Sequence, residues 1–254
     1  MVAPISWPVN SSLLRESELL SADSMLYDLM TVSVIRQGTH IKDTHVCKIQ
    51  SLLNCSTLVQ NLKVVILLKI NRRVLVIGSS GMLGNAVTRY FSGDTNYVTT
   101  GTVRSEDSVA LFSDKVRDNI VWGVDADDFD TITNIIMQKH PDIVINCVGM
   151  VKQLSDANDP LVALPINSLF PHKLARFCSE HNARLIHIST DCVFSGSKGG
   201  YVDDDTPDSQ DLYGVSKRLG EVHYPNAITL RTSIIGHELN GNRSLVNWFL
   251  SQEG

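Results

Sequence analysis

A tyrosine and a lysine four residues apart, Tyr213 and Lys217, form the first pair in the sequence that could do chemistry. On a helix, this spacing places both side chains on one face and next to each other. A nearby ammonium favours the phenolate, so the spacing predicts that Lys217 lowers the pKa of Tyr213. Such a tyrosine can give a proton to a substrate oxygen or take one from it. The same spacing also arises by chance on helix surfaces. The neighbouring motifs must therefore show whether this pair belongs to an active site.

A hydroxyl-bearing stretch, Ser189-Thr190-Asp191, ends an apolar segment upstream of this pair. A hydroxyl at that place can hydrogen-bond a substrate carbonyl while Tyr213 protonates it. The hydroxyl, the tyrosine and the lysine therefore suit proton transfer to a carbonyl oxygen, provided that a redox cofactor lies beside them.

A glycine-rich turn supplies the place for such a cofactor. Gly78, Gly81 and Gly84 follow the apolar run 74–77, and a helical pattern begins at once after them. Gly78 allows a tight turn, Gly81 lets backbone N–H groups approach a pyrophosphate, and Gly84 lets the helix pack close to the sheet. The helix N-terminus adds N–H donors and partial positive charge. The turn predicts a dinucleotide site, with an ordinary glycine-rich strand–turn–helix as the alternative.

The elements that must position these residues alternate between strands and helices from residue 71 onward. Strands are expected at 74–77, 97–103, 120–124, 143–147, 185–189 and 227–231. Helices are expected from residue 82 and at 127–140, 167–181, 213–223 and 245–250. This alternation predicts an α/β fold with a doubly wound parallel sheet, that is, an NAD(P)-binding Rossmann domain over residues 71–254.

Candidate binding positions come directly after predicted strand ends, where ligands bind in such sheets. These positions are Gly78–Gly84, Arg104, Asp125, Cys147–Gly149 and Ser189–Asp191. Arg104 bears on the cofactor, because an arginine after the second strand suits the 2′-phosphate of NADP, whereas an acidic residue suits the 2′-hydroxyl of NAD. We therefore expect NADP(H), with NAD(H) as the alternative. Arg104 could instead stack on the adenine or lie in solvent.

Longer motifs make a family resemblance visible. They read G-S-S-G-M-L-G at 78–84, I-N-C-V-G at 145–149, I-N-S at 166–168, S-T-D-C-V-F-S-G at 189–196, D-L-Y-G-V-S-K-R-L-G-E at 211–221 and L-R-T-S-I-I-G at 230–236. In this order they resemble the extended short-chain dehydrogenase/reductases and, within that branch, the dTDP-4-dehydrorhamnose reductase family. The resemblance implies NADPH-dependent reduction of the C4 ketone of a nucleotide-linked 4-keto-6-deoxy sugar, as in dTDP-rhamnose biosynthesis.

The resemblance also implies a role for each matching residue. Thr190 would polarise the ketone, Tyr213 would donate the proton, and Lys217 would hold the nicotinamide ribose and tune Tyr213. Asp191 would contact the sugar, beside Thr190. The implied cofactor contacts are Gly78, Ser80, Gly81, Met82, Leu83, Gly84, Asp125, Ala126, Gly149, Met150, Val151, Tyr213 and Lys217.

Three departures from the family pattern leave alternatives open. Cys192 stands where the family usually has tyrosine, and Ile234 where an aromatic residue is frequent. The sequence ends at Gly254, so the C-terminal substrate domain of the family is expected to be truncated. A non-catalytic NADP-binding regulatory subunit, resembling the beta subunit of methionine adenosyltransferase, and an inactive fragment are therefore the alternatives. A dehydratase is disfavoured, because that class carries Asp-Glu after the threonine.

Composition bounds the partners and the compartment. The 254 residues carry a formal net charge of −5, which gives no reason to expect nucleic acid. No apolar run is long enough to span a membrane, and no signal peptide is recognised. Five cysteines are an odd number, which favours reduced thiols in the cytoplasm. We expect a nucleotide-sugar substrate, no nucleic acid and no membrane, with a homodimer as one possible assembly.

Residues 1–70 are expected to form a poorly ordered extension. A loose apolar stripe over Ser12–Met30 would suit a helix, but no clean periodicity follows. His40, His45, Cys47 and Cys55 do not have the spacing of a usual zinc site, so no metal site is expected. Cys192 is interpreted as a packed thiol rather than a nucleophile, because no neighbouring histidine could activate it.

Overall fold

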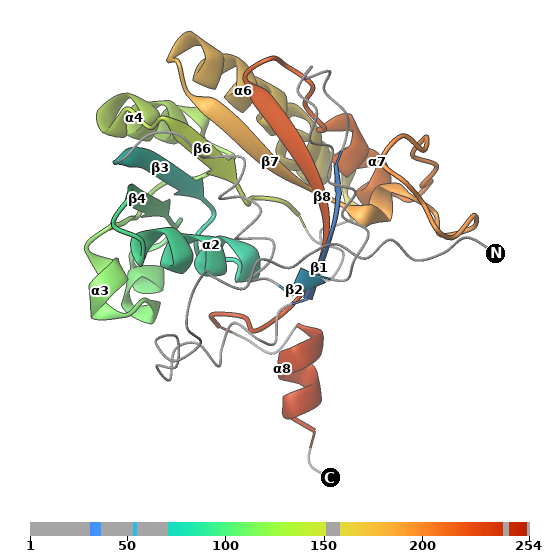
Figure 1. Cartoon of the computed structure of the whole chain (residues 1–254), viewed down its shortest axis with the longest axis horizontal. Coiled ribbons are helices and arrows are strands. Elements are labelled where there is room, and N and C mark those ends of the chain that lie inside the picture. Colours follow the sequence, from blue (N-terminus) through green and yellow to red (C-terminus); the bar gives the residue numbers. More distant parts are fainter. Residues whose placement is uncertain (1–30, 37–52, 55–70, 151–157, 241–243, 253–254) are drawn as a thin grey trace, which may run out of the picture.

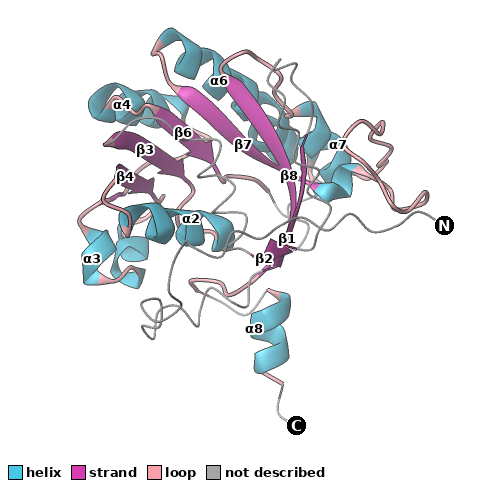
Figure 2. Cartoon of the chain, in the orientation of Figure 1, coloured by secondary structure: helices cyan, strands magenta, loops and turns pink. Residues whose placement is uncertain are grey.

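A single mixed sheet organises the part of the chain that the computed structural model describes, residues 31–36, 53–54, 71–150, 158–240 and 244–252. Its strand order is β2-β1-β8-β7-β6-β3-β4-β5 (Figures 1 and 2). The strands are β1 Thr31–Arg36, β2 Leu53–Asn54, β3 Arg72–Ile77, β4 Tyr97–Thr102, β5 Ile120–Val121, β6 Ile143–Asn146, β7 Arg184–Thr190 and β8 Ala227–Ile235.

The strands from β3 to β8 pair in parallel throughout. Taken from β5 to β8, their order follows the 3-2-1-4-5-6 pattern of doubly wound dinucleotide-binding sheets. The strand order reverses between β3 and β6, and ligands of such sheets bind beyond the carboxyl ends at this point. The predicted α/β Rossmann fold is therefore confirmed.

Helices cover both faces of the parallel strands. They are α2 Met82–Ser92, the 3₁₀ helix η2 Glu106–Leu111, α3 Asp114–Arg117, α4 Phe129–Lys139, α5 Pro160–Leu164, the π-helical η4 Pro165–Leu169, α6 Phe170–Glu180, the 3₁₀ turn η5 Asp191–Val193, α7 Leu212–Leu219 and α8 Leu245–Leu250. Figure 1 shows α2 on one face and α4 with α6 on the other. None of the helices in the described segments is both long enough and apolar enough to cross a membrane.

The central strand β3 is covered on both faces, which explains its uninterrupted apolar run 74–77. Val74 and Val76 pack in the cluster that contains α2, whereas Leu75 and Ile77 pack in the cluster of α4 and α6. All four side chains are buried because both faces of the strand are covered. Burial on both faces fixes the carboxyl end of β3, from which the glycine turn starts.

Helix boundaries follow local signals in the sequence. The Asp128 carboxylate caps α4 by accepting from the N–H of Asp130, and His140 ends that helix with a φ of 46°. Asp211 caps α7 by accepting from the N–H of Gly214 at 2.8 Å. The cap on α7 fixes the start of the helix that carries the tyrosine and the lysine.

Several predicted boundaries were wrong. The strand expected over 120–124 is only the two residues of β5, and the helix expected over 213–223 ends at Leu219, where Gly220 caps it. The helix expected over 167–181 starts earlier, as α5, and passes through a π-helical turn at η4. Pro165 lacks the N–H that a regular α-helix needs at that position, which suits this turn. β8 runs on to Ile235, because β1 pairs antiparallel along it.

Two segments before residue 70 take part in the sheet. β1 pairs antiparallel with β8 over its whole length, and β2 pairs with β1. No strand was expected in these segments, because their sequence shows no clean periodicity. The helix expected over 12–30 and the four residues considered as metal ligands lie outside the described residues. The division of the chain at residue 70 stays a prediction.

Candidate active site

The loop after β3 is held tightly between two strands. Gly78 has a φ of +87°, a left-handed conformation that favours glycine. The Ser79 N–H donates to the Thr102 carbonyl at 2.8 Å, and Ser79 Oγ lies 2.8 Å from Thr88 Oγ1. The Thr102 N–H donates to Ser79 Oγ at 3.1 Å. Buried Ser79 therefore locks the loop to β4 and α2, while its neighbour Ser80 is exposed.

The close packing predicted for Gly84 is present. A Cβ at this position would overlap the Gly78 carbonyl oxygen and lie 2.8 Å from its carbonyl carbon. Gly81 is the N-cap of α2, and no side chain caps the helix or places an acidic group in its first turn. The first N–H groups of α2, at Met82 and Leu83, have no partner within the helix. This loop therefore fits the phosphates of a dinucleotide.

The residues expected on the adenine side lie after β4 and β5. Arg104 is exposed two residues beyond β4, and its carbonyl accepts from the Gly123 N–H at 3.1 Å. The Asp125 carboxylate accepts from the Asp127 N–H at 3.1 Å, at the start of α4. Ala126 packs beside the α4 and α6 core. Arg104 thus lies exposed beyond the carboxyl end of β4.

Lys217 is buried at the centre of the site, with only 5% of its surface exposed. Its Nζ donates to the Ile188 carbonyl at 2.8 Å. A Cβ at Gly149 would lie 3.3 Å from this Nζ, so the glycine leaves the space over the ammonium open. Burial lowers the pKa of Lys217 to about 8, while Glu221 and Cys147 act in the opposite direction.

Tyr213 corrects one expectation from the sequence. Its pKa is raised above the ordinary value, first because burial disfavours the phenolate, although a hydrogen bond with Thr190 acts in the opposite direction. Cys192 and the carboxylates of Asp191 and Asp211 also raise the pKa of Tyr213. The predicted lowering by Lys217 was therefore wrong. A tyrosine that keeps its proton at neutral pH is a proton donor, which is the role that a reduction requires.

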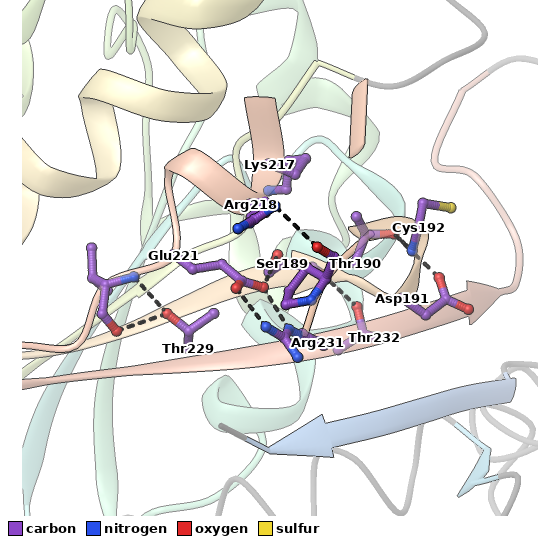
Figure 3. A network of polar contacts seen from close by, with 12 residues as sticks. Ser189, Thr190, Asp191, Cys192, Lys217, Arg218, Glu221, Thr229, Arg231 and Thr232 are labelled. Carbon is purple, nitrogen blue, oxygen red and sulfur yellow. Dashed lines mark hydrogen bonds and ion pairs between the residues drawn. The ribbon is translucent and has the colours of Figure 1, made fainter. Parts of the chain in front are cut away.

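Thr190 is the last residue of β7 and Asp191 the first of η5 (Figure 3). Thr190 Oγ1 donates to Asp191 Oδ1 at 3.2 Å and accepts from the Cys192 N–H at 3.1 Å. Thr190 thereby caps the short turn η5 and is itself buried. The structure thus brings Thr190, Tyr213 and Lys217 together.

Asn167 is a site residue that the sequence analysis missed. Its Oδ1 accepts from the Met150 N–H at 2.9 Å, and its Nδ2 donates to Ser216 Oγ at 3.1 Å. It therefore ties the loop after β6 to the helix that carries Tyr213 and Lys217. The signal was a buried amide inside the I-N-S motif, next to Pro165, where η4 departs from regular helix geometry.

The expected cofactor contact of Val151 and the expected absence of a metal site are not tested by the structure. Val151 lies outside the described residues. Within the described segments, no group of three or more histidine, cysteine, aspartate or glutamate side chains could hold a metal ion.

Comparisons with known proteins agree with this geometry. A family model described as the RmlD substrate binding domain matches residues 72–251. The dTDP-4-dehydrorhamnose reductase of Mycobacterium tuberculosis (strain CDC 1551 / Oshkosh) is 31% identical over 172 residues, which cover 64% of this chain and 50% of that protein. Methionine adenosyltransferase 2 subunit beta of Bos taurus is 30% identical over 152 residues, which cover 59% of this chain and 42% of that protein.

A solved UDP-Glc/GlcNAc 4-epimerase from Campylobacter jejuni has a TM-score of 0.53 at 16% identity, over 59% of this chain and 47% of that chain. This likeness shows the fold alone. The chain spans about half the length of the curated relatives it matches. The family match, by contrast, extends over most of the chain, from β3 to the end of α8. The chain therefore belongs to the family of the RmlD substrate binding domain, which confirms the resemblance that its motifs predicted.

Proposed function

We propose that this chain carries the cofactor-binding and catalytic part of an NADPH-dependent reductase that acts on the C4 ketone of a nucleotide-linked 4-keto-6-deoxy sugar. The observation that carries the proposal is the buried Lys217, set beside protonated Tyr213 and Thr190 at the carboxyl edge of the sheet. The similarity to a dTDP-4-dehydrorhamnose reductase supports the substrate class. Exposed Arg104 supports NADP(H) over NAD(H).

The chain's own residues account for the proton half of the reaction. NADPH, when bound, supplies the hydride for the ketone carbon. Thr190 Oγ1 would hydrogen-bond the ketone oxygen, exchanging its present contact with Asp191. Tyr213 would then give its proton to that oxygen as negative charge develops there. Lys217 would stabilise the resulting phenolate and, through the space left by Gly149, hold a ribose hydroxyl.

The test is oxidation of NADPH in the presence of a dTDP-linked 4-keto-6-deoxy sugar, followed by absorbance. Substrate-dependent oxidation, with the alcohol at C4 identified in the product, is the expected result. If the chain binds NADPH but shows no substrate-dependent oxidation, the reductase proposal is wrong for this polypeptide.

A second function rests on the similarity to the methionine adenosyltransferase beta subunit. A regulatory subunit would bind NADP(H) without turnover and would form a stable complex with a methionine adenosyltransferase. Size-exclusion chromatography of the mixed proteins would show such a complex, and turnover on the sugar nucleotide would argue against this reading.

Replacing Arg104 with alanine is expected to weaken NADPH binding about 10- to 100-fold and to leave NADH binding nearly unchanged. A guanidinium that pairs with the 2′-phosphate contributes on the order of 1.5–3 kcal/mol through charged hydrogen bonds. Titration of nucleotide fluorescence measures both affinities. Arg176→Ala is the matched control, because Arg176 is exposed and pairs only with Glu180 among the described residues. An equal loss for both nucleotides would remove Arg104 as the reader of the 2′-phosphate.

A further inference from the structure

A buried carboxylate lies directly behind the proposed catalytic residues. Glu221 follows α7 by two residues, one helical turn beyond Lys217, and only 7% of its surface is exposed. Its Oε1 accepts from Arg231 Nε at 2.7 Å and from Ser189 Oγ at 3.0 Å, and its Oε2 accepts from Arg231 Nη2 at 2.8 Å (Figure 3). Glu221 is therefore fixed by charged donors on both oxygens.

Arg231 is the largest fully buried side chain among the described residues. Its guanidinium lies 5.0 Å from the centre of the Phe194 ring, and within the described segments Nη1 has no hydrogen-bond partner. An ion pair buried in this way gives little net stability compared with apolar residues of similar volume. A contribution to folding stability therefore does not explain why the Glu221–Arg231 ion pair lies behind the site.

The pair connects the two elements that carry the site. Ser189 directly precedes Thr190, and its carbonyl accepts from Thr232 Oγ1 at 3.1 Å. The carbonyl of Ile188 accepts from Lys217 Nζ. Lys217 on α7 and Glu221 just after α7 thus hold two successive residues of β7, Ile188 and Ser189.

The charges around Lys217 point to the same role. The groups that act on it are Glu221, Cys147 after β6 and His187 on β7, with Arg231 behind Glu221. Tyr213 lies four residues earlier on the same helix. His187 is fully buried and its pKa lies well below the ordinary value, first because of burial and then because of Lys217, so it is neutral. Glu221 is the main group that raises the pKa of Lys217 against burial.

We propose that Glu221 is a positioning residue for this site: clamped by Arg231, it fixes Ser189 and thereby the Thr190 end of β7, and it supplies the buried negative charge that faces the Lys217 ammonium. The role of this charge in a reaction rests on the proposed reductase function. The charge itself can be tested on the chain without cofactor or substrate.

The test is a pH titration of the lysine side chains by ¹³C NMR of the full chain labelled at lysine Cε. The Lys217 signal is assigned by its loss in Lys217→Met. In Glu221→Gln, the midpoint of Lys217 is expected to fall by about one pH unit from its value in the unaltered chain, because a nearby opposite charge shifts a titration by that order and Glu221 is the main group that raises the pKa of Lys217. Glu180→Gln, which removes an exposed carboxylate paired with Arg176, should leave the midpoint unchanged.

Glu221→Gln leaves Arg231 without its counter-charge, which destabilises the fold, so a second variant completes the test. Glu221→Leu combined with Arg231→Met removes both charges and keeps an apolar interior. It should lower the Lys217 midpoint in the same direction but by less, because the positive charge of Arg231 is lost as well. An unchanged Lys217 midpoint in either folded variant would overturn the proposal. A lowered midpoint together with no turnover by the unaltered chain would count against the reductase function and not against the role of Glu221.

Discussion

Tyr213→Phe is expected to lower turnover on the sugar nucleotide by about a thousand-fold, within the 10²- to 10⁴-fold range typical of general acids. The substitution keeps the ring that fills this half-buried position and removes only the hydroxyl. Because burial raises the pKa of Tyr213, the native side chain carries its proton at neutral pH and can give it to the ketone oxygen. Steady-state oxidation of NADPH at saturating cofactor measures the effect.

Cofactor affinity separates this role from a general loss of structure. Tyr213→Phe should bind NADPH within about three-fold of the unaltered chain, because the glycine loop and Lys217 remain in place. Tyr224→Phe is the matched control: Tyr224 is a tyrosine nearby in the chain whose hydroxyl lies 2.9 Å from His172 Nδ1, away from Thr190. Turnover by Tyr213→Phe at the native rate would exclude this tyrosine as the proton donor.

The features that the sequence predicted well are those set by local chemistry. The apolar run of β3, the spacing of Gly78 and Gly84, and the proximity of Tyr213 to Lys217 on α7 follow from strand burial, turn geometry and helical periodicity. Each depends on residues fewer than ten positions apart. Topology followed as well, because alternating strands and helices admit few other arrangements.

The features that the sequence did not predict depend on residues far apart in the chain. The pKa of Tyr213 was expected to fall because Lys217 lies four residues away. The burial of the Tyr213 side chain raises this pKa instead. Asn167 reaches Met150 and Ser216 across 17 and 49 positions. Glu221 and Arg231 meet because the segment after α7 turns back onto β8, where Val222 also hydrogen-bonds Thr229. Sequence patterns predict the spacing of side chains along one helix or strand. The burial of a side chain and its hydrogen-bond partners depend on how the helices and strands pack together.

Gly84→Ala is expected to destabilise the fold by about 2–3 kcal/mol, which is typical when an added methyl group is forced into a packed interior. Its Cβ would overlap the Gly78 carbonyl oxygen and come within 3.1 Å of Ser79 Cα, so it meets backbone and not a side chain that could rotate away. The helix-favouring effect of alanine, about 1 kcal/mol, offsets only part of this cost. Urea unfolding followed by circular dichroism gives the free energy of unfolding.

The same substitution should also weaken NADPH binding at least about ten-fold, because α2 can relieve the overlap only by moving its N-terminus away from the Gly78 turn. Gly93→Ala, at the other end of α2, is the matched control. There the φ is −82° and the new Cβ would lie 3.5 Å from the Arg89 and Tyr90 carbonyl oxygens, an ordinary contact, so stability should stay within about 1 kcal/mol. If Gly84→Ala proved as stable as Gly93→Ala and bound NADPH equally well, the close contact between α2 and the glycine turn would not be what shapes this binding loop.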